Sequence, residues 1–276
     1  MQLQKNLRTV DIKTTRVNLE LCVAAIKNWC SSRRLQLNAD KTELIWFDSR
    51  SNLKKLTQSE TSLQLGSTII EPSDVVRNLG VCMDSELNMR VHIGKVAAIC
   101  FSYLRRLRQI WFVLTSLSMR RLVSALIISR IDYCNSVLYG LLAITLAPLQ
   151  RVLHAAVRLI VNLDYRDHMT PAMKELHWFP IAYRIKYKLC LMMHVAVNNR
   201  SPTYYQHTRP DIISASPWTA SLTWGFEVPR VKTEFGRRSF SITGPTVWNE
   251  LPHNIRSTNN VTTFKLVLKA RLFKLA

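Results

Sequence analysis

Acidic residues are scarce in this chain, and their scarcity sets the sign of its surface. The 276 residues include 38 Lys and Arg against 18 Asp and Glu, a formal net charge of +20 at pH 7. A surplus of this size exceeds what solubility requires. It predicts a polyanionic partner, either a nucleic acid or an acidic membrane face.

Glycine and proline are also few. Seven glycines and ten prolines are too few for an all-β architecture, which needs special backbone conformations at its many turns. Hydrophobic residues make up 47% of the chain, enough for a real core. We therefore expect a folded, mainly helical protein.

The common catalytic and metal-binding signatures are missing. The chain contains no G-x-S-x-G, no H-E-x-x-H, no Walker-type loop and no glycine-rich dinucleotide fingerprint. No C-x-x-C pair occurs among the six cysteines, which we expect to be reduced and mostly buried. The histidines are not at ligand spacing either, which argues against a zinc site.

Membrane signals are weak as well. Residues 1–21 are repeatedly charged and lack the apolar core of a signal peptide. The longest stretch without formal charge, 133–150, contains Asn135, Gly140 and Gln150, so burial in protein is favoured over burial in lipid. We expect an intracellular protein, nuclear or cytoplasmic, without a membrane partner.

Hydrophobic periodicity divides the chain into a mixed part and a helical part. Three- and four-residue steps predict a first helix, and three β-prone pieces divided by polar turns predict a small antiparallel sheet. Helical periodicity then dominates, and a proline-bearing stretch interrupts it. The fold class is therefore α+β, mainly α. The expected segments are a helix over 16–34, strands over 42–47, 62–70 and 75–83, helices from about 87 to 114 and over 118–130, 146–163 and 181–198, a surface excursion over 200–234, and a final helix over 262–273.

Basic helices are the strongest physical signal. Between Leu87 and Ile131 there are eight Lys or Arg and no Asp or Glu. Charged helix faces are most often simply solvated, but a solvated face normally mixes both signs. We therefore predict phosphate contact. The candidate residues are Arg105, Arg106, Arg108, Arg120, Arg121, Arg151 and Arg158.

Aromatic and imidazole side chains have simpler interpretations. Trp178, Trp218, Trp224 and Trp248 could stack on exposed bases, but core packing is the better prediction for each. His154 lies beside apolar residues on a predicted helix, which favours a structural or solvent-facing role over catalysis.

Several long blocks resemble one protein family. They are LQLNADKTELIWF (35–47), NLGVCMD (78–84), RIDYCNSVLYGL (130–141), DHMTPAMKELHWFPIAYRIKYK (167–188) and WNELPHNIRSTNNVTTFKLVLKARLF (248–273). Together they resemble the carboxy-terminal part of Jockey-like non-LTR retrotransposon (LINE-type) reverse transcriptases, in the family's order and over nearly the whole chain.

The resemblance implies a domain plan and some site residues. Residues 1–86 would be part of the polymerase palm, following its Tyr-x-Asp-Asp loop, with a palm-remnant sheet. Residues 87–199 would be a helical, thumb-like region, and 200–276 a carboxy-terminal extension with an irregular loop and a final helix. Lys41 matches a palm lysine that aids nucleotide addition, and Leu79, Gly80 and Val81 resemble the hairpin that grips the primer.

The same resemblance implies that the catalytic set is incomplete here. Two-metal phosphoryl transfer needs carboxylates that hold Mg²⁺ ions about 3.5–4 Å apart, and no Asp-Asp dipeptide occurs in the sequence. We expect no complete catalytic site, no metal site and no cofactor in this chain, although the intact family enzyme uses Mg²⁺. The expectation is a truncated RNA-directed DNA polymerase fragment, inactive alone, that still binds RNA and DNA as template and primer.

Two alternatives remain open at this point. The segment could belong to an active reverse transcriptase whose missing polymerase half is present in a longer product. It could also be a helical protein-interaction module derived from the element. Primer extension and partner binding separate these alternatives from residual nucleic-acid binding.

Overall fold

The computed structural model describes residues 12–38, 41–55, 61–65, 68–164, 166–202 and 225–275. It divides the chain into two compact units, 1–92 and 93–276. Helices predominate, with two small antiparallel sheets, so the predicted α+β, mainly α class is confirmed. The domain boundaries predicted after residues 86 and 199 stay predictions.

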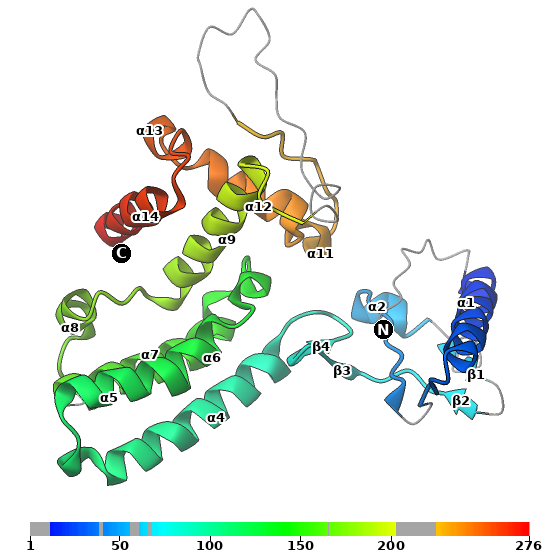
Figure 1. Ribbon diagram of the computed structural model, residues 1–276, viewed down its shortest axis with the longest axis horizontal. Coiled ribbons are helices and arrows are strands. Elements are labelled where there is room, and N and C mark those ends of the chain that lie inside the picture. Colours follow the sequence, from blue (N-terminus) through cyan, green and yellow to red (C-terminus); the bar gives the residue numbers. More distant parts are fainter. Residues whose placement is uncertain are drawn as a thin grey trace, which may run out of the picture. The chain divides into compact units, whose positions relative to one another are not determined.

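The first unit combines a long helix with two β-hairpins (Figure 1). Helix α1 (Ile12–Ser32) contacts strand β1 (Leu63–Leu65), and the Gln64 backbone N–H donates to Glu20 Oε1 at 3.0 Å. Apolar side chains of both hairpins are buried here, among them Ile70 and Val76. The other elements of the unit are α2 (Arg50–Leu53), β2 (Thr68–Ile70), β3 (Val75–Asn78) and β4 (Val81–Asp84).

The strand predictions were partly wrong. Residues 42–47 form no strand; only Leu44 makes an isolated parallel bridge, to Pro72. The single expected sheet is two separate two-stranded sheets, β1–β2 and β3–β4. The stretch predicted as one strand over 75–83 turns back on itself at Leu79 and Gly80, because both residues adopt positive φ.

The second unit is helical. Its elements are α4 (Arg90–Gln109, whose first turn belongs to the first unit), the 3₁₀ turn η2 (Trp111–Val113), α5 (Ser116–Val123), the π-helical turn η3 (Ser124–Ile128), α6 (Ser129–Asp132), η4 (Asn135–Leu138), α7 (Ala143–Val161), α8 (Met169–Glu175), α9 (Ile181–Val197), α11 (Glu234–Arg237), α12 (Phe240–Asn249), α13 (His253–Arg256) and α14 (Val261–Leu275). Every helix predicted from residue 87 onward is present. The first of them ends at Gln109, earlier than its periodicity suggested.

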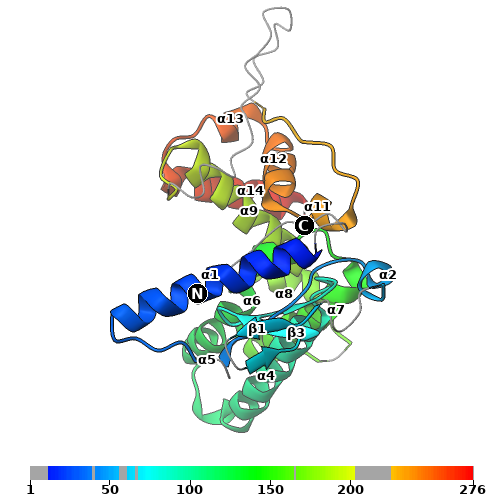
Figure 2. The same cartoon turned by 90° about the vertical axis from the view of Figure 1, so that its right-hand side faces the viewer.

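Helix α9 is the centre of this unit. It contacts α7, α12 and α14 (Figure 2). Ile185, Leu189 and Met193 repeat at four-residue steps along it and are 1–2% exposed. Because other helices pack against several sides of α9, this segment is apolar over more than one face.

Helix α7 is long and apolar enough to cross a membrane by length and composition, the one such helix in the described part of the chain. A core helix meets the same criteria. Here Val152, Leu153 and Ala156 are fully buried against the rest of the unit.

Candidate nucleic-acid interface

The α4 arginines lie outside the stripe that packs into the core. Cys100, Leu104 and Leu107 are buried and follow one another at four- and three-residue steps. At about 100° per residue, Arg105 and Arg106 project from the opposite side, and both are exposed. No described residue forms a hydrogen bond or ion pair with either side chain, so their donors are available to a ligand.

Arg108, Arg121 and Arg151 are also available to a ligand. All three are exposed and make no hydrogen bond or ion pair within the described ranges. Arg106 and Arg108 also lie in the last turn of α4, where cations complement the helix dipole. Five of the seven predicted arginines can therefore reach an external phosphate without breaking a contact in the fold.

The remaining two predicted arginines have partners inside the fold. Arg120 donates from Nη2 to the Leu176 carbonyl oxygen at 3.1 Å, which ties α5 to the end of α8. Arg158 donates from Nε to the Asp164 carbonyl oxygen at 3.3 Å, just beyond the end of α7. Each carbonyl oxygen accepts from only one of the five N–H donors of its guanidinium group.

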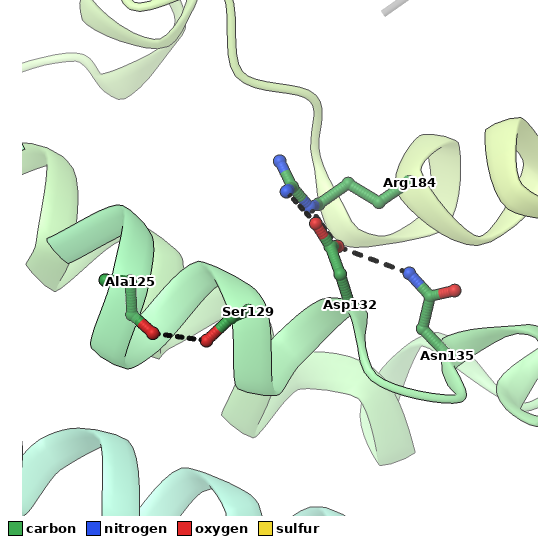
Figure 3. Close-up of polar contacts among 5 residues, drawn as sticks. All are labelled: Ala125, Ser129, Asp132, Asn135 and Arg184. Atoms are coloured by element: carbon green, nitrogen blue, oxygen red, sulfur yellow. Dashed lines mark hydrogen bonds and ion pairs between the residues drawn. The ribbon is translucent and has the colours of Figure 1, made fainter. Parts of the chain in front are cut away.

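The first acid after the basic stretch is already paired. Arg184 of α9 donates two hydrogen bonds to Asp132, from Nε to Oδ1 at 2.7 Å and from Nη2 to Oδ2 (Figure 3). Asn135 Nδ2 donates a third, to Oδ1 at 3.3 Å. Such a two-donor pair fixes geometry as well as charge. Asp132 is therefore committed to holding α6 against α9 and does not neutralise the neighbouring arginines.

An eighth arginine was not singled out from the sequence. Arg130 of α6 lies 5.1 Å from the centre of the Tyr103 ring and donates to its hydroxyl at 3.3 Å. The contact joins α6 to α4. No sequence signal marks it, because the two residues are 27 positions apart and meet only when the helices pack.

Sequence reasoning also missed an exposed apolar turn between α4 and α5. The spacing of apolar residues predicted that the helix would continue through Ile110 and Leu114. The helix instead ends at Gln109, and Phe112 in the following turn is 80% exposed. One signal could have found the break. Thr115 is an N-cap residue for α5, and its hydroxyl accepts from the Ser118 backbone N–H at 3.2 Å.

The residues predicted to resemble a primer grip form the turn of the β3–β4 hairpin. Asn78 pairs with Val81, so Leu79 and Gly80 are the two turn residues, with φ of 46° and 85°. Leu79 is 80% exposed and Val81 is buried. The turn thus exposes the Leu79 side chain to solvent, while the buried Val81 side chain anchors the strand that follows.

Lys41 is exposed. Its backbone N–H donates to the Asn38 carbonyl oxygen at 3.3 Å, and Thr42 donates to the same oxygen at 3.0 Å. Within the described ranges, no group of three or more His, Cys, Asp or Glu could hold a metal ion. The predicted catalytic role of Lys41 stays a prediction.

Asp84 shows what an isolated carboxylate does in this fold. It is buried, and its two oxygens accept the backbone N–H groups of Met89 at 2.8 Å and Asn88 at 3.0 Å. These bonds hold Leu87 and Met89 at positive φ. The carboxylate stabilises the turn that leads into α4, and both oxygens are occupied.

The predictions for tryptophan and histidine have mixed outcomes. Trp178 and Trp248 are buried, as predicted, while Trp218 and Trp224 lie outside the described residues. His154 is half-buried and shares a 2.7 Å hydrogen bond with Gln150, whose Oε1 accepts the first backbone N–H of α9 at 2.9 Å. The histidine is structural, as expected.

The cysteine prediction holds for pairing but not for burial. All six thiols are free, yet only Cys82, Cys100 and Cys190 are buried. Burial raises the pKa of Cys100 to about 11 and that of Cys190 to about 12, so both remain protonated near neutral pH. Neither thiol is an activated nucleophile.

The second unit also contains a pocket of about 410 Å³. Apolar atoms make up most of its lining surface, and none of the described residues that line it is acidic. It is lined by Val197, Asn198, Gly225, Phe226, Trp248, His253, Arg256, Ser257 and Asn259.

Comparison with protein-family models, with curated proteins and with solved structures gives no match for this chain. The geometry of the basic helices therefore carries the functional argument.

Proposed function

We propose that this chain binds the phosphate backbone of RNA or DNA through the arginines of α4, α5 and α7, as the thumb-like segment of a non-LTR retrotransposon reverse transcriptase. The observation that carries the proposal is a set of exposed arginines that form no hydrogen bond or ion pair with any described residue: Arg105, Arg106, Arg108, Arg121 and Arg151. Guanidinium groups match phosphate geometry with two parallel donors. The sequence blocks that resemble this family support the identification of the segment.

Electrostatics supports a polyanion as the partner. Between Leu87 and Ile131 no carboxylate opposes the basic side chains, and Asp132 is held by Arg184. Each phosphate that an arginine neutralises releases condensed counterions. If about six phosphates are contacted, the logarithm of affinity should fall with the logarithm of salt concentration at a slope of about −5.

The test is a salt titration of binding to a fluorescent oligonucleotide. We expect the triple variant Arg105→Gln, Arg106→Gln, Arg108→Gln to bind more weakly and to reduce the slope by roughly one for each phosphate contact removed. Circular dichroism should show unchanged helix content, because all three side chains are exposed.

The matched control is Arg237→Gln. Arg237 is an exposed arginine of the same unit, but it is paired with Glu234 at 3.0 Å. It should leave both affinity and slope near those of the parent chain. Binding that does not depend on salt, or equal losses in the triple variant and the control, would contradict the proposal.

The proposal assigns binding, and not nucleotide addition, to this chain. Phosphoryl transfer would need paired carboxylates for two metal ions, and the sequence has no Asp-Asp dipeptide. Primer extension with the purified chain and Mg²⁺ checks this part. Incorporation of nucleotides would overturn it.

One observation favours a second candidate, in which the chain works as part of a longer or two-part polymerase. Helix α1 exposes Val17, Leu21 and Trp29 at 48%, 64% and 58% along one stripe. An exposed apolar stripe of this kind is typical of a surface that another polypeptide covers. Leu21→Asp should then abolish association with a segment carrying the catalytic loop, while nucleic-acid binding by the chain alone is retained.

A further inference from the structure

The turn between α4 and α5 exposes a contiguous apolar surface. We call residues Ile110–Leu114 the aromatic tip. Trp111 is 41% exposed, Phe112 80% and Val113 71%. Apolar side chains exposed singly are ordinary, but a contiguous group marks a binding surface. Both Figure 1 and Figure 2 draw this turn at the lower end of the helical unit, away from α9, α12 and α14.

Backbone hydrogen bonds give the aromatic tip a fixed shape. Ile110 donates to the Leu107 carbonyl oxygen at 3.3 Å, Val113 to Ile110 at 3.1 Å and Leu114 to Trp111 at 3.2 Å. Below the tip, Leu107 and Met119 are 4% and 2% exposed. A buried base and a closed 3₁₀ turn hold the rings outward, so little conformational entropy is lost when they meet a ligand.

Arginines flank the aromatic tip on both sides. Arg108 lies four residues before Phe112, near the end of α4, and Arg121 lies in the last turn of α5. From Val96 to Ser129 every basic side chain is arginine and no acidic side chain occurs. The surface therefore combines flat apolar rings with cations that bind phosphate.

This combination fits unpaired nucleotides better than it fits lipid. A nucleotide strand offers flat bases at the spacing of its phosphates, and aromatic rings stack on such bases whatever their sequence. Arginine binds phosphate with two donors and also stacks on bases. An anionic membrane attracts lysine as well as arginine, and lysine is absent from this stretch.

We infer that Phe112 and Trp111 stack on unpaired bases of a single strand while Arg108 and Arg121 bind its phosphates. This inference rests on the proposed function and adds a specific ligand to it. The aromatic tip is the part of the interface that distinguishes a single strand from a duplex, because bases inside a duplex are already stacked on one another.

The first experiment measures binding of the full chain to a short single strand containing 2-aminopurine, whose fluorescence reports stacking. We expect Phe112→Ala to weaken binding about tenfold, within the range of alanine substitutions at stacked bases. Phe112→Leu should lose as much, because it keeps the apolar character but not the ring. Phe112→Trp should bind like the parent chain.

The matched control is Phe235→Ala. Phe235 is an exposed aromatic of α11, 48% accessible and outside the tip. This control should bind like the parent. All of these positions are exposed, so the variants should keep the parent's circular dichroism spectrum.

The second experiment replaces the strand with an abasic one of equal length and charge. The parent chain should bind it about tenfold more weakly than the base-bearing strand, and Phe112→Ala should cause no further loss. If Phe112→Ala binds the base-bearing strand as tightly as the parent, stacking is overturned while salt-dependent phosphate binding stands. If neither strand binds in a salt-dependent way, the proposed function fails too.

The third experiment offers the competing ligand. Vesicles of phosphatidylcholine with phosphatidylserine are titrated against the parent chain and Phe112→Leu. We expect weaker binding to vesicles than to the single strand. Tighter binding to vesicles that Phe112→Leu retains would overturn the inference in favour of a membrane surface.

Discussion

At the scale of single residues, Leu79 is out of place for its backbone. It lies in the left-handed region at φ 46°, where residues other than glycine and asparagine are strained. Its side chain is 80% exposed, so burial contributes little to offset this strain. Leu79→Asn should stabilise the β3–β4 hairpin by about 0.5–1 kcal/mol, because asparagine tolerates this region. Hydrogen exchange of peptides covering β3 and β4 should slow by a few-fold.

The control for this prediction is Leu79→Ala. It removes the same exposed side chain without favouring positive φ, so it should not slow exchange. Equal exchange in the two variants would show that strain at this position is not significant. A loss of nucleic-acid affinity in both variants, with stability unchanged, would connect Leu79 to the predicted primer grip.

At the scale of elements, a glycine sets how closely α12 lies on α9. A Cβ at Gly244 would be 2.6 Å from Met193 Sδ and 3.1 Å from Phe240 Cζ. Met193 is 1% exposed, so its side chain is surrounded by other atoms of the unit. Gly244→Ala should therefore destabilise the helical unit by about 1–3 kcal/mol, the usual cost of overpacking, in spite of alanine's higher helix propensity.

The matched control for that substitution is Gly94→Ala. Gly94 lies within α4, and a Cβ there would meet nothing within 4 Å. It should leave stability unchanged or raise it by up to about 1 kcal/mol. Urea unfolding followed by circular dichroism measures both variants. A stabilised Gly244→Ala would show that α12 can move away from α9 at little cost.

A second element-scale prediction concerns the pair that ties α6 to α9. The Arg184 side chain is 12% exposed and that of Asp132 is 40% exposed, with Nε and Oδ1 at 2.7 Å. Removing one partner leaves a largely buried guanidinium without its carboxylate. A double-mutant cycle with Asp132→Asn and Arg184→Gln should give a coupling free energy of about 1–2 kcal/mol, reduced by solvent screening at Asp132.

The comparison pair is Glu234 and Arg237, which is exposed on both sides. Its coupling free energy should be about 0–0.5 kcal/mol, as for most surface pairs. If the two cycles give equal values, the Asp132–Arg184 contact does not hold the two helices together. Thermal unfolding at one ionic strength is the measurement for both cycles.

At the scale of the whole molecule, the sequence predicted elements better than it predicted their contacts. The periodicity of Ile185, Leu189 and Met193 was enough to find α9, because a buried stripe imprints its spacing on the sequence. The apolar run over 42–47 looked equally regular but forms only one bridge. A strand exists only where a neighbour supplies hydrogen bonds, and that information is not local.

For the candidate interface too, the sequence predicted the arginines but not their contacts. Exposed arginines follow from charge and helical period, so five of them could be found without a structure. The partners of Arg120 and Arg158 are backbone carbonyls at helix ends, and no side-chain pattern encodes them. The aromatic tip was missed because Ile110 and Leu114 continue the helical spacing beyond the residue where the helix ends.

Histidines that are buried or half-buried should make stability depend on pH across the whole molecule. Burial lowers the pKa of His92, His154 and His194 below the usual value near 6.5. For His194, Nε2 lies 2.7 Å from the Thr258 carbonyl oxygen, to which it donates; this bond partly opposes the lowering, and nearby Arg200 adds to it. Nδ1 is buried without a partner among the described residues, beside Phe264 at a ring distance of 4.1 Å.

The sign follows from where each state takes up protons. Below pH 6.5 the unfolded chain binds protons at these rings, while the folded chain resists them until the pH falls below their lowered pKa values. Their contribution to stability is therefore complete above pH 6.5 and is lost as the pH falls below it. The melting temperature should decrease between pH 7.5 and 5.5. His194→Gln should show a smaller decrease, because it keeps a donor but cannot be charged.

His253→Gln is the matched control, since it removes an exposed imidazole of α13 instead of a buried one. This variant also controls for the general rise in positive charge at low pH, which strengthens electrostatic repulsion in a chain that already carries +20. Parallel pH profiles for the parent chain and His194→Gln would mean that repulsion alone causes the loss. Since repulsion is screened by salt and desolvation of a buried ring is not, repeating the profiles at high salt separates the two causes.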